Sequence, residues 1–188
     1  MDRQAIQHGL EQLAAVARDS AGRADQLLAI AHRYQDTLAR GGTLYFAGNG
    51  GSAADAQHVA AEYVVRYLRP GRRARAAVAL TTDSSILTAA GNDLGFDQVF
   101  ARQVEALCGP EDLLILHSTS GESENLLTAA RAARALGAGV VAFLGKGGGR
   151  LAGLADLSFI VPSDETSRIQ EIHLAAEHII AGLLEEQA

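Results

Sequence analysis

The sequence predicts an α/β protein in which a five-stranded parallel sheet carries helices on both faces and is preceded by N-terminal helices. Two observations support this fold class. Five apolar runs of strand length are continuous rather than alternating, which is typical of strands buried on both faces. Helical stretches separate these runs, and such alternation favours a parallel sheet covered by helices. The predicted strands are 43–47, 76–80, 113–117, 140–144 and 157–161.

The first forty residues are predicted to be helical. Ala, Leu, Gln and Arg dominate them, and Gly22 is the expected break between two helices. Further helices are predicted at 52–68, at 84–107 with a break near 91–95, at 122–136 and at 165–187. A chain of 188 residues suits one domain. We therefore expect residues 1–188 to form a single domain, with 1–40 as a helical extension involved in oligomerisation.

Composition and charge limit the classes of function. A formal net charge of −6 argues against a general nucleic-acid binder. The one cysteine, Cys108, excludes an internal disulfide and fits a reducing compartment. The first thirty residues hold no apolar signal core, and no apolar run approaches the ~20 residues of a membrane span. We expect a soluble, cytoplasmic protein with neither nucleic acid nor a membrane as partner.

The stretch RPGRRAR at 69–75 is the only charge run in the sequence. It lies between a predicted helix and a predicted strand, where charged residues are usually hydrated. We therefore interpret it as a solvated loop.

A glycine-rich loop follows the first predicted strand. GNGGS at 48–52 lacks the lysine of a Walker A loop and the spacing of the dinucleotide pattern Gly-x-Gly-x-x-Gly. Ligands of an open parallel sheet bind outside the carboxyl ends of the strands, so this loop lies where a binding site is expected. A second glycine-rich stretch, GKGGG at 145–149, contains no hydroxyl and is interpreted as a turn.

Hydroxyl side chains are concentrated after the third predicted strand. Residues 118–123 read Ser-Thr-Ser-Gly-Glu-Ser and lead directly into a predicted helix. Hydroxyls and free backbone N–H groups at a helix N-terminus together bind anions. A single serine is enough to cap a helix. Four hydroxyls in six residues therefore favour phosphate binding.

Candidate acid–base or metal-binding side chains lie on two predicted helices. His58 and Glu62 are four residues apart, so they point the same way from the helix that follows the first loop. One imidazole and one carboxylate make half a metal site or an acid–base pair, although the same spacing is common in surface pairs. The last helix adds candidates among which periodicity alone does not choose: Gln170, Glu171, His173, Glu177 and His178.

Five motifs occur together in an order that resembles a known family. They are GNGGSAADAQHVAAE, LTTDSSILTAAGNDLGF, STSGES, GGGRLAGLADL and VPSDETSRIQEIH. From about Leu44 to the C-terminus the chain is similar to the phosphoheptose isomerases of the sugar-isomerase (SIS) fold. The resemblance implies an aldose–ketose isomerase that converts D-sedoheptulose 7-phosphate to D-glycero-D-manno-heptose 7-phosphate through an enediolate. It also implies a homotetramer with active sites at subunit interfaces.

The resemblance assigns roles to residues at matching positions. Zinc, one ion per subunit, is implied at His58, Glu62, Gln170 and His178. Phosphate binding is implied at Ser118, Thr119, Ser120 and Ser123. Sugar contacts are implied at Asn49, Gly50, Gly51, Asn92 and Asp93, and further substrate contacts at Glu62, Arg66 and Gln170. His173 and Glu177 are then left as structural residues.

The family's reaction gives catalytic roles to Glu62 and His178. Isomerisation moves a proton between adjacent carbons, so it needs a base at the C–H bond and an acid or base at the oxygens. Glu62 is the expected base and His178 its acid partner, and zinc would stabilise the enediolate as a Lewis acid. Because Glu62 is also an implied zinc ligand, the sequence leaves open which of its two roles dominates.

Two residues depart from the family's pattern. His117 stands where members usually have a small or apolar residue before Ser118, and Glu122 stands where they often have asparagine. A carboxylate that points into a phosphate loop would weaken anion binding. At a helix N-terminus it can instead face solvent and interact favourably with the helix dipole. We therefore expect Glu122 to point outward.

Two other functions fit the same fold. A non-catalytic binding protein, similar to the initiator-associating protein of bacterial replication, would lack equivalents of Glu62 and His178, and both residues are present here. An isomerase of a pentose or hexose phosphate would keep the fold and the phosphate loop. The RIQEIH motif favours a heptose over these shorter sugars.

Overall fold

The protein contains a sheet of five parallel strands in the order β2-β1-β3-β4-β5. The structure is a computed structural model and describes residues 2–186. The strands are β1 (Leu44–Gly48), β2 (Ala77–Ala79), β3 (Leu113–Ser118), β4 (Gly139–Leu144) and β5 (Leu157–Ile160). Each strand begins within one residue of its predicted start. The predicted fold class is therefore confirmed.

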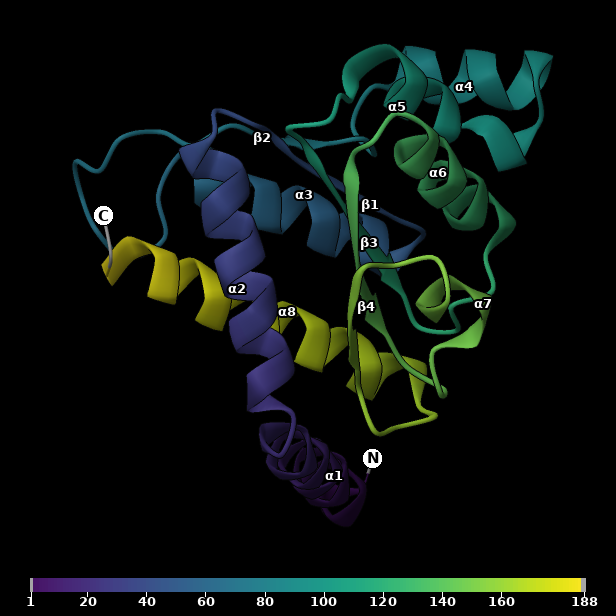
Figure 1. The fold of residues 1–188 in the computed structure, drawn as a ribbon. Helices are drawn as coiled ribbons and strands as arrows, with labels where there is room; N and C mark the ends of the chain where they lie inside the picture. The colour runs from purple at the N-terminus through teal and green to yellow at the C-terminus, as the bar shows by residue number, and fades with distance from the viewer. Residues whose placement is uncertain (1, 187–188) are drawn as a thin grey trace.

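Helices cover both faces of the sheet (Figure 1). One face carries α2 (Ala24–Ala39), α3 (Gly51–Val64) and α8 (Thr166–Glu186). The other face carries α4 (Ser84–Asp93), the short 3-10 helix η1 (Phe96–Gln98), α5 (Ala101–Leu107), α6 (Glu124–Ala135) and α7 (Gly149–Ala152). The two helical layers make two separate apolar cores, one on each side of the strands.

Strand β3 shows why the apolar runs are continuous. Leu113 and Ile115 belong to the core beneath α2, α3 and α8, whereas Leu114 and Leu116 belong to the core beneath α5 and α6. All four side chains are fully buried. Successive side chains of a strand point to opposite faces, so a strand with a core on both faces needs apolar residues at every position.

Helix α1 (Arg3–Ala21) lies beside α8 and projects away from the sheet (Figure 1). Its N-terminus is capped by Asp2, whose carboxylate accepts the N–H of Gln4 at 2.9 Å. The chain turns at Gly22, where a break was predicted. The side chains of Ile6 and Leu10 remain 67% and 64% exposed. Helix α1 therefore presents apolar side chains that its own chain does not cover.

Several helix boundaries differ from the sequence prediction. Helix α3 ends at Val64 rather than at residue 68, because the chain leaves the helix to fold back over α8. The predicted helix at 84–107 is divided into α4, η1 and α5 near the expected break. The predicted end of the last helix at residue 187 lies outside the described residues. None of the helices in the range 2–186 is long and apolar enough to cross a membrane.

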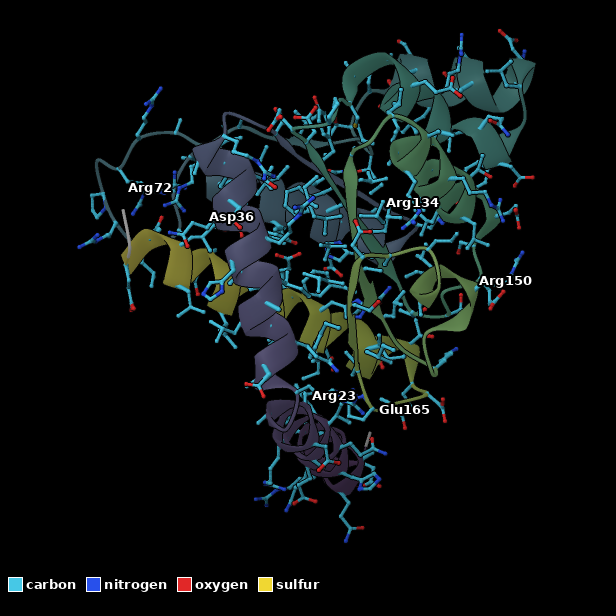
Figure 2. All side chains as sticks on the ribbon, viewed as in Figure 1. Arg23, Asp36, Arg72, Arg134, Arg150 and Glu165 are labelled. Carbon is cyan, nitrogen blue, oxygen red and sulfur yellow. The ribbon has the colours of Figure 1, made fainter. Side chains whose placement is uncertain are left out.

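The arginine-rich stretch 69–75 is a loop with mostly exposed residues, as predicted, but Arg72 and Arg75 dock it onto the protein. Arg72 Nε lies 2.6 Å from Glu185 Oε1, and the two side chains are only 5% and 3% exposed. The Glu185 carboxylate also accepts the backbone N–H groups of Tyr67, Leu68 and Arg69 at 2.7–2.8 Å. Figure 2 shows Arg72 beside the C-terminal end of α8. A single buried carboxylate thus organises the whole segment.

The same stretch supplies partners to the carbonyl groups that end α8. Arg69 Nη1 donates to the carbonyl oxygen of Glu185 at 2.8 Å, and Arg75 Nη2 donates to that of Leu184 at 2.6 Å. The last carbonyls of a helix have no partner within the helix, and cations are favourable beside them. Arg72 Nη2 donates to the carbonyl oxygen of Glu62. The segment therefore ties the end of α8 to α3.

Glu185 is held in its ionised form. Burial by itself would raise the pKa of its carboxyl group. Hydrogen bonds from the N–H of Tyr67, from the side chain of Arg72 and from the N–H groups of Arg69 and Leu68 outweigh burial and lower the pKa to about 2. A carboxyl group whose pKa is lower in the folded state stabilises the fold above its unfolded pKa. The pKa of an unperturbed glutamate carboxyl group is 4.5.

We predict that Glu185→Gln lowers the free energy of unfolding at pH 7 by about 3–5 kcal/mol, because the buried Arg72 then lacks its counter-charge. The difference between wild type and variant should be complete above pH 4.5 and shrink as the pH falls toward 2. Urea unfolding across this pH range measures it. The exposed neighbour Glu186 provides the control variant Glu186→Gln. Equal unfolding midpoints for Glu185→Gln and Glu186→Gln would contradict the assignment.

Candidate active site

The loops after β1 and β3 meet at the carboxyl edge of the sheet. The two strands are neighbours, and their register aligns Gly48 with His117. Asn49 and Asn125 exchange two side-chain amide hydrogen bonds of 2.9 Å each. This pair joins the glycine-rich loop to the start of α6. The predicted sugar-binding loop and the predicted phosphate loop therefore lie side by side.

Gln170 lies against the N-terminal end of α3. Its Nε2 atom is 3.4 Å from Ser52 Oγ. A Cβ atom on Gly51 would lie 2.7 Å from the same nitrogen, which is closer than packed atoms approach. A side chain at position 51 would therefore push Gln170 away. Gly51 permits the close approach of α8 to the first loop, a role that the sequence alone did not indicate.

The hydroxyls of residues 118–123 do not all have the same role. Ser118 Oγ accepts the N–H of Gly121 at 3.0 Å, and Ser120 Oγ accepts the N–H of Glu122 at 3.2 Å. These two hydroxyls shape the turn. Ser123 stands at the N-cap position of α6, but its side chain makes no capping hydrogen bond within the described chain. The hydroxyl of Ser123 therefore remains available to a ligand at the start of the helix.

The second glycine-rich stretch, 145–149, supports the hydroxyl-rich loop from behind. Gly121 has a φ of +66°, and a Cβ atom there would overlap the carbonyl oxygen of Gly148. The N–H of Leu151 donates to the carbonyl oxygen of Gly121 at 3.0 Å. The predicted turn is present, and its glycines allow the two loops to pack backbone against backbone.

Glu122 is held at the surface by Arg150, in agreement with its predicted orientation. Its carboxylate accepts Nε of Arg150 at 2.6 Å and the backbone N–H of Arg150 at 2.8 Å. Both hydrogen bonds lower the pKa of Glu122, and the one from the Arg150 side chain has the larger effect. Figure 2 shows Arg150 on α7 at the outer edge of the molecule. The ion pair therefore fixes the loop without placing a bare carboxylate in it.

His58, Glu62 and His178 come together between α3 and α8, and we call them the His–Glu–His cluster. His58 Nε2 lies 2.8 Å from His178 Nε2 and 3.3 Å from Glu62 Oε1. Within residues 2–186 it is the one group of three or more His, Cys, Asp or Glu side chains whose ligand atoms all lie within 4.8 Å of one another. Two imidazole nitrogens and one carboxylate oxygen are a common donor set of catalytic zinc sites. The cluster is thus able to hold a metal ion.

Tyr67 supports the cluster, and the sequence analysis missed it. Its ring stacks on that of His178, with centroids 5.2 Å apart and planes inclined by 16°. The backbone N–H of Tyr67 is held by the Glu185 carboxylate at 2.8 Å. Because α3 ends before Tyr67, helical spacing from Glu62 could not have indicated this contact. The folded-back segment therefore helps to orient His178.

Several predicted residues lie apart from the His–Glu–His cluster within one chain. Arg66 is exposed and lies beyond the last residue of α3, so it does not share the helical face of Glu62. Asn92 donates to Asp93 Oδ1 at 2.6 Å at the end of α4, on the other side of the sheet. Gln170 and His178 are eight residues apart in α8, which is about 12 Å along the axis. A single chain does not bring these groups together.

Of the three remaining candidates of the last helix, Glu171 is exposed and bonded to Arg168, whereas His173 and Glu177 are fully buried. His173 Nε2 donates to the carbonyl oxygen of Leu144 at 3.0 Å. Burial and the neighbouring His117 lower the pKa of His173 to about 3, so this imidazole is neutral. Both side chains face the sheet, whereas His178 faces α3. The position of each residue around α8 thus places His173 and Glu177 in the core and His178 in the His–Glu–His cluster.

Comparison with known proteins identifies the family. The SIS domain model matches residues 10–145. The chain is 52% identical over 162 residues to the phosphoheptose isomerase of Roseiflexus sp. (strain RS-1), covering 86% of this chain and 82% of that protein. It is 51% identical over 163 residues to the phosphoheptose isomerase of Aquifex aeolicus, covering 87% and 85%.

A solved structure agrees with the sequence comparison. Phosphoheptose isomerase GmhA of Neisseria gonorrhoeae superposes with a TM-score of 0.93 at 36% identity, covering 98% of each chain. The match extends through the N-terminal helices, the sheet and the last helix. The fold, the paired loops at the carboxyl edge and the similarity in sequence agree, and the chain belongs to the phosphoheptose isomerase family of SIS-domain proteins.

Proposed function

We propose that this protein interconverts D-sedoheptulose 7-phosphate and D-glycero-D-manno-heptose 7-phosphate. The observation that carries the proposal is the His–Glu–His cluster, which unites acid–base side chains from α3 and α8 in a member of this family. A non-catalytic protein of the same fold has no need of such a cluster. The neighbouring anion-binding loop supplies the second requirement, a place for the phosphate.

The reaction needs one proton to move between two adjacent carbons. We infer that the Glu62 carboxylate takes the proton from C1 of the ketose and returns it to C2 of the aldose. His178 exchanges the proton of the neighbouring oxygens, so that the charge of the enediolate is balanced. Glu62 is 19% exposed and lies beside His58, so its carboxylate is reachable from solvent and held in place.

The His–Glu–His cluster fits the zinc ion that the family implies, because it offers two nitrogens and one carboxylate oxygen within a single ion's reach. We infer that His58, Glu62 and His178 hold the ion, which would supply Lewis-acid polarisation of the sugar oxygens. Gln170 lies beside Ser52 at the other end of α3. To act as a zinc ligand, as predicted, Gln170 would have to reach the His–Glu–His cluster of a neighbouring subunit.

The phosphate-binding role of Ser118, Thr119, Ser120 and Ser123 is part of the proposal. The backbone N–H groups at the start of α6 and the hydroxyl of Ser123 supply the donors. Asn49, Gly50 and Gly51 line the adjoining loop, where the sugar chain would run. His58 lies seven residues into α3 from Gly51, about 10 Å along the axis. A substrate with phosphate on C7 and reaction at C1 and C2 needs such a separation.

We further propose a homotetramer with active sites at subunit interfaces. An apolar groove of about 440 Å³ lies between α1, α2 and α8, with Leu28, Ile179 and Leu183 among its lining residues. Leu28 and Ile179 are 47% and 55% exposed, as expected of a surface that another subunit covers. Residues 1–40 would then act as the oligomerisation extension of a single domain spanning 1–188. Arg66, Asn92 and Asp93 would reach the substrate from a neighbouring subunit. A cytoplasmic location remains a prediction from the sequence.

We predict that Ser123→Ala raises KM for sedoheptulose 7-phosphate by roughly tenfold or more, since a hydrogen bond to a charged group contributes about 1.5–3 kcal/mol. Steady-state kinetics measure this change, and kcat should change far less. Thr128→Ala is the matched control, because the Thr128 hydroxyl donates to the Glu124 carbonyl oxygen inside α6. An unchanged KM in Ser123→Ala would move the phosphate to another part of the loop.

We predict that Glu62→Gln lowers kcat by about 10²–10⁴, because it keeps the shape of the side chain and removes its basicity. Zinc content per subunit, measured on the same preparation, separates the two roles of Glu62. Retained zinc with lost turnover indicates a base, whereas lost zinc with activity partly restored by added zinc indicates a ligand. Glu105→Gln, an exposed substitution on α5, is the control. Solvent-deuterium exchange that persists in Glu62→Gln would transfer the role of base to His178.

A further inference from the structure

A buried chain of polar side chains crosses the core beneath the proposed active site. Tyr34 of α2 donates its hydroxyl to Glu177 Oε1 at 2.9 Å, and His117 Nε2 of β3 lies 3.1 Å from the same oxygen. All three residues are at most 1% exposed. We call them the buried triad. They come from three elements and from widely separated parts of the sequence.

Aromatic rings surround the buried triad, and the His173 ring stacks on that of His117 with centroids 6.0 Å apart. The His117 ring stacks on Phe46, with centroids 6.3 Å apart, and meets Phe143 edge-on at 5.2 Å. Among residues 2–186, neither His117 Nδ1 nor Glu177 Oε2 has a hydrogen-bond partner. Polar groups in such a place lose more by leaving water than the remaining hydrogen bonds return. Apolar side chains of similar size would fill the same space without this cost, so stability alone does not account for the triad.

Two members of the buried triad are joined through the backbone to the two halves of the proposed site. His117 directly precedes Ser118, the first residue of the phosphate loop. Glu177 directly precedes His178, a member of the His–Glu–His cluster. The hydrogen bond between His117 and Glu177 therefore links the end of β3 to α8. It restricts how far α8 can rotate about its own axis relative to the strand.

The hydrogen bond makes the contact between β3 and α8 depend on direction. Apolar side chains such as Ile172 and Ile180 tolerate small rotations of α8, whereas a hydrogen bond weakens as its angle changes. A side chain tip lies about 6 Å from the helix axis, so a rotation of about 10° displaces it by about 1 Å. A misplacement of about 1 Å at a reacting group can cost about 10² in rate.

We propose that the buried triad is a positioning device, which sets the rotation of α8 against β3 and so places His178 relative to the phosphate loop. His117, Glu177 and Tyr34 are positioning residues and touch no substrate. The proposal rests on the proposed function for its catalytic consequence. It also has a consequence that does not depend on turnover, because His178 is part of the His–Glu–His cluster.

The decisive variant is the double substitution His117→Ile with Glu177→Leu, which removes the triad and keeps the volume of the core. Replacing a buried polar pair by apolar residues is often neutral or stabilising, whereas removing one partner is not. We expect the urea midpoint of the double variant to equal or exceed that of the wild type. Glu177→Leu alone should unfold at lower urea. This comparison separates a change in stability from a change in position.

Two readouts test positioning in the double variant. We expect kcat to fall by roughly tenfold or more with KM for the sugar phosphate within about threefold. We expect the affinity of the purified, metal-free protein for Co²⁺, followed by titration calorimetry, to fall by about 10–100-fold, the usual effect of losing support behind a ligand. Ile172→Val, a purely apolar change on the same helix, is the control and should leave both readouts unchanged.

The outcomes are distinguishable. Wild-type kcat and Co²⁺ affinity in a stably folded double variant would overturn the positioning role and leave the triad as core filling. A wild-type protein without isomerase activity would instead contradict the proposed function. Tyr34→Phe, which removes only one hydroxyl, should shift both readouts in the same direction by a smaller factor. An effect in Tyr34→Phe larger than that of the double variant would also contradict the proposal.

Discussion

The packing of α8 against the sheet and against its neighbour α3 is the contact on which the rest of the structure depends. This one helix contributes Gln170 beside the first loop, His178 to the His–Glu–His cluster and Glu185 to the buried pair with Arg72. These residues lie about two turns apart from one another, on the side of α8 that faces α3. Each of them finds its partner on α3 or on the segment that follows α3. The two helices therefore act as one unit, and a displacement of α8 would disturb every part of the site.

Two buried acids hold α8 in place by different means. Glu185 binds the chain after α3 through backbone N–H groups and Arg72, which fixes the C-terminal end of the helix along its axis. Glu177 binds His117 and Tyr34 inside the core, which fixes its rotation. Both acids lie within the last ten residues of the helix, on either side of the exposed Ile179. His178, a member of the His–Glu–His cluster, is thus bounded by polar contacts that tolerate little movement.

The sequence predicted the elements well and the tertiary partners poorly. Continuous apolar runs locate strands with cores on both faces, so β1 and β3 were predicted closely. The docking of the loop 69–75 was not predicted, because its partner Glu185 lies more than a hundred residues away and leaves no local signal. Tyr67 was missed for the same reason. Composition describes a segment on its own, whereas docking depends on what the fold brings beside it.

The site residues follow the same rule. His58 and Glu62 share a helix face, so their spacing alone indicated a pair, and the fold confirmed that His178 joins them. Gln170 and His178 lie on the same helix, but no sequence pattern shows that they contact different parts of α3. Gln170 lies beside its N-terminal end and His178 lies further along it, beside His58. His117 departed visibly from the family pattern. Its partner Glu177 could not be recognised until the fold placed β3 against α8.

We propose that this arrangement isomerises a seven-carbon sugar phosphate by proton transfer. NMR of the purified protein with sedoheptulose 7-phosphate in D₂O tests it most directly, with ribulose 5-phosphate and fructose 6-phosphate as comparison substrates. We expect a heptose 7-phosphate that carries deuterium at C2 and forms faster than any aldose from the shorter sugars. Failure to convert sedoheptulose 7-phosphate, or faster conversion of a pentose or hexose phosphate, would contradict it.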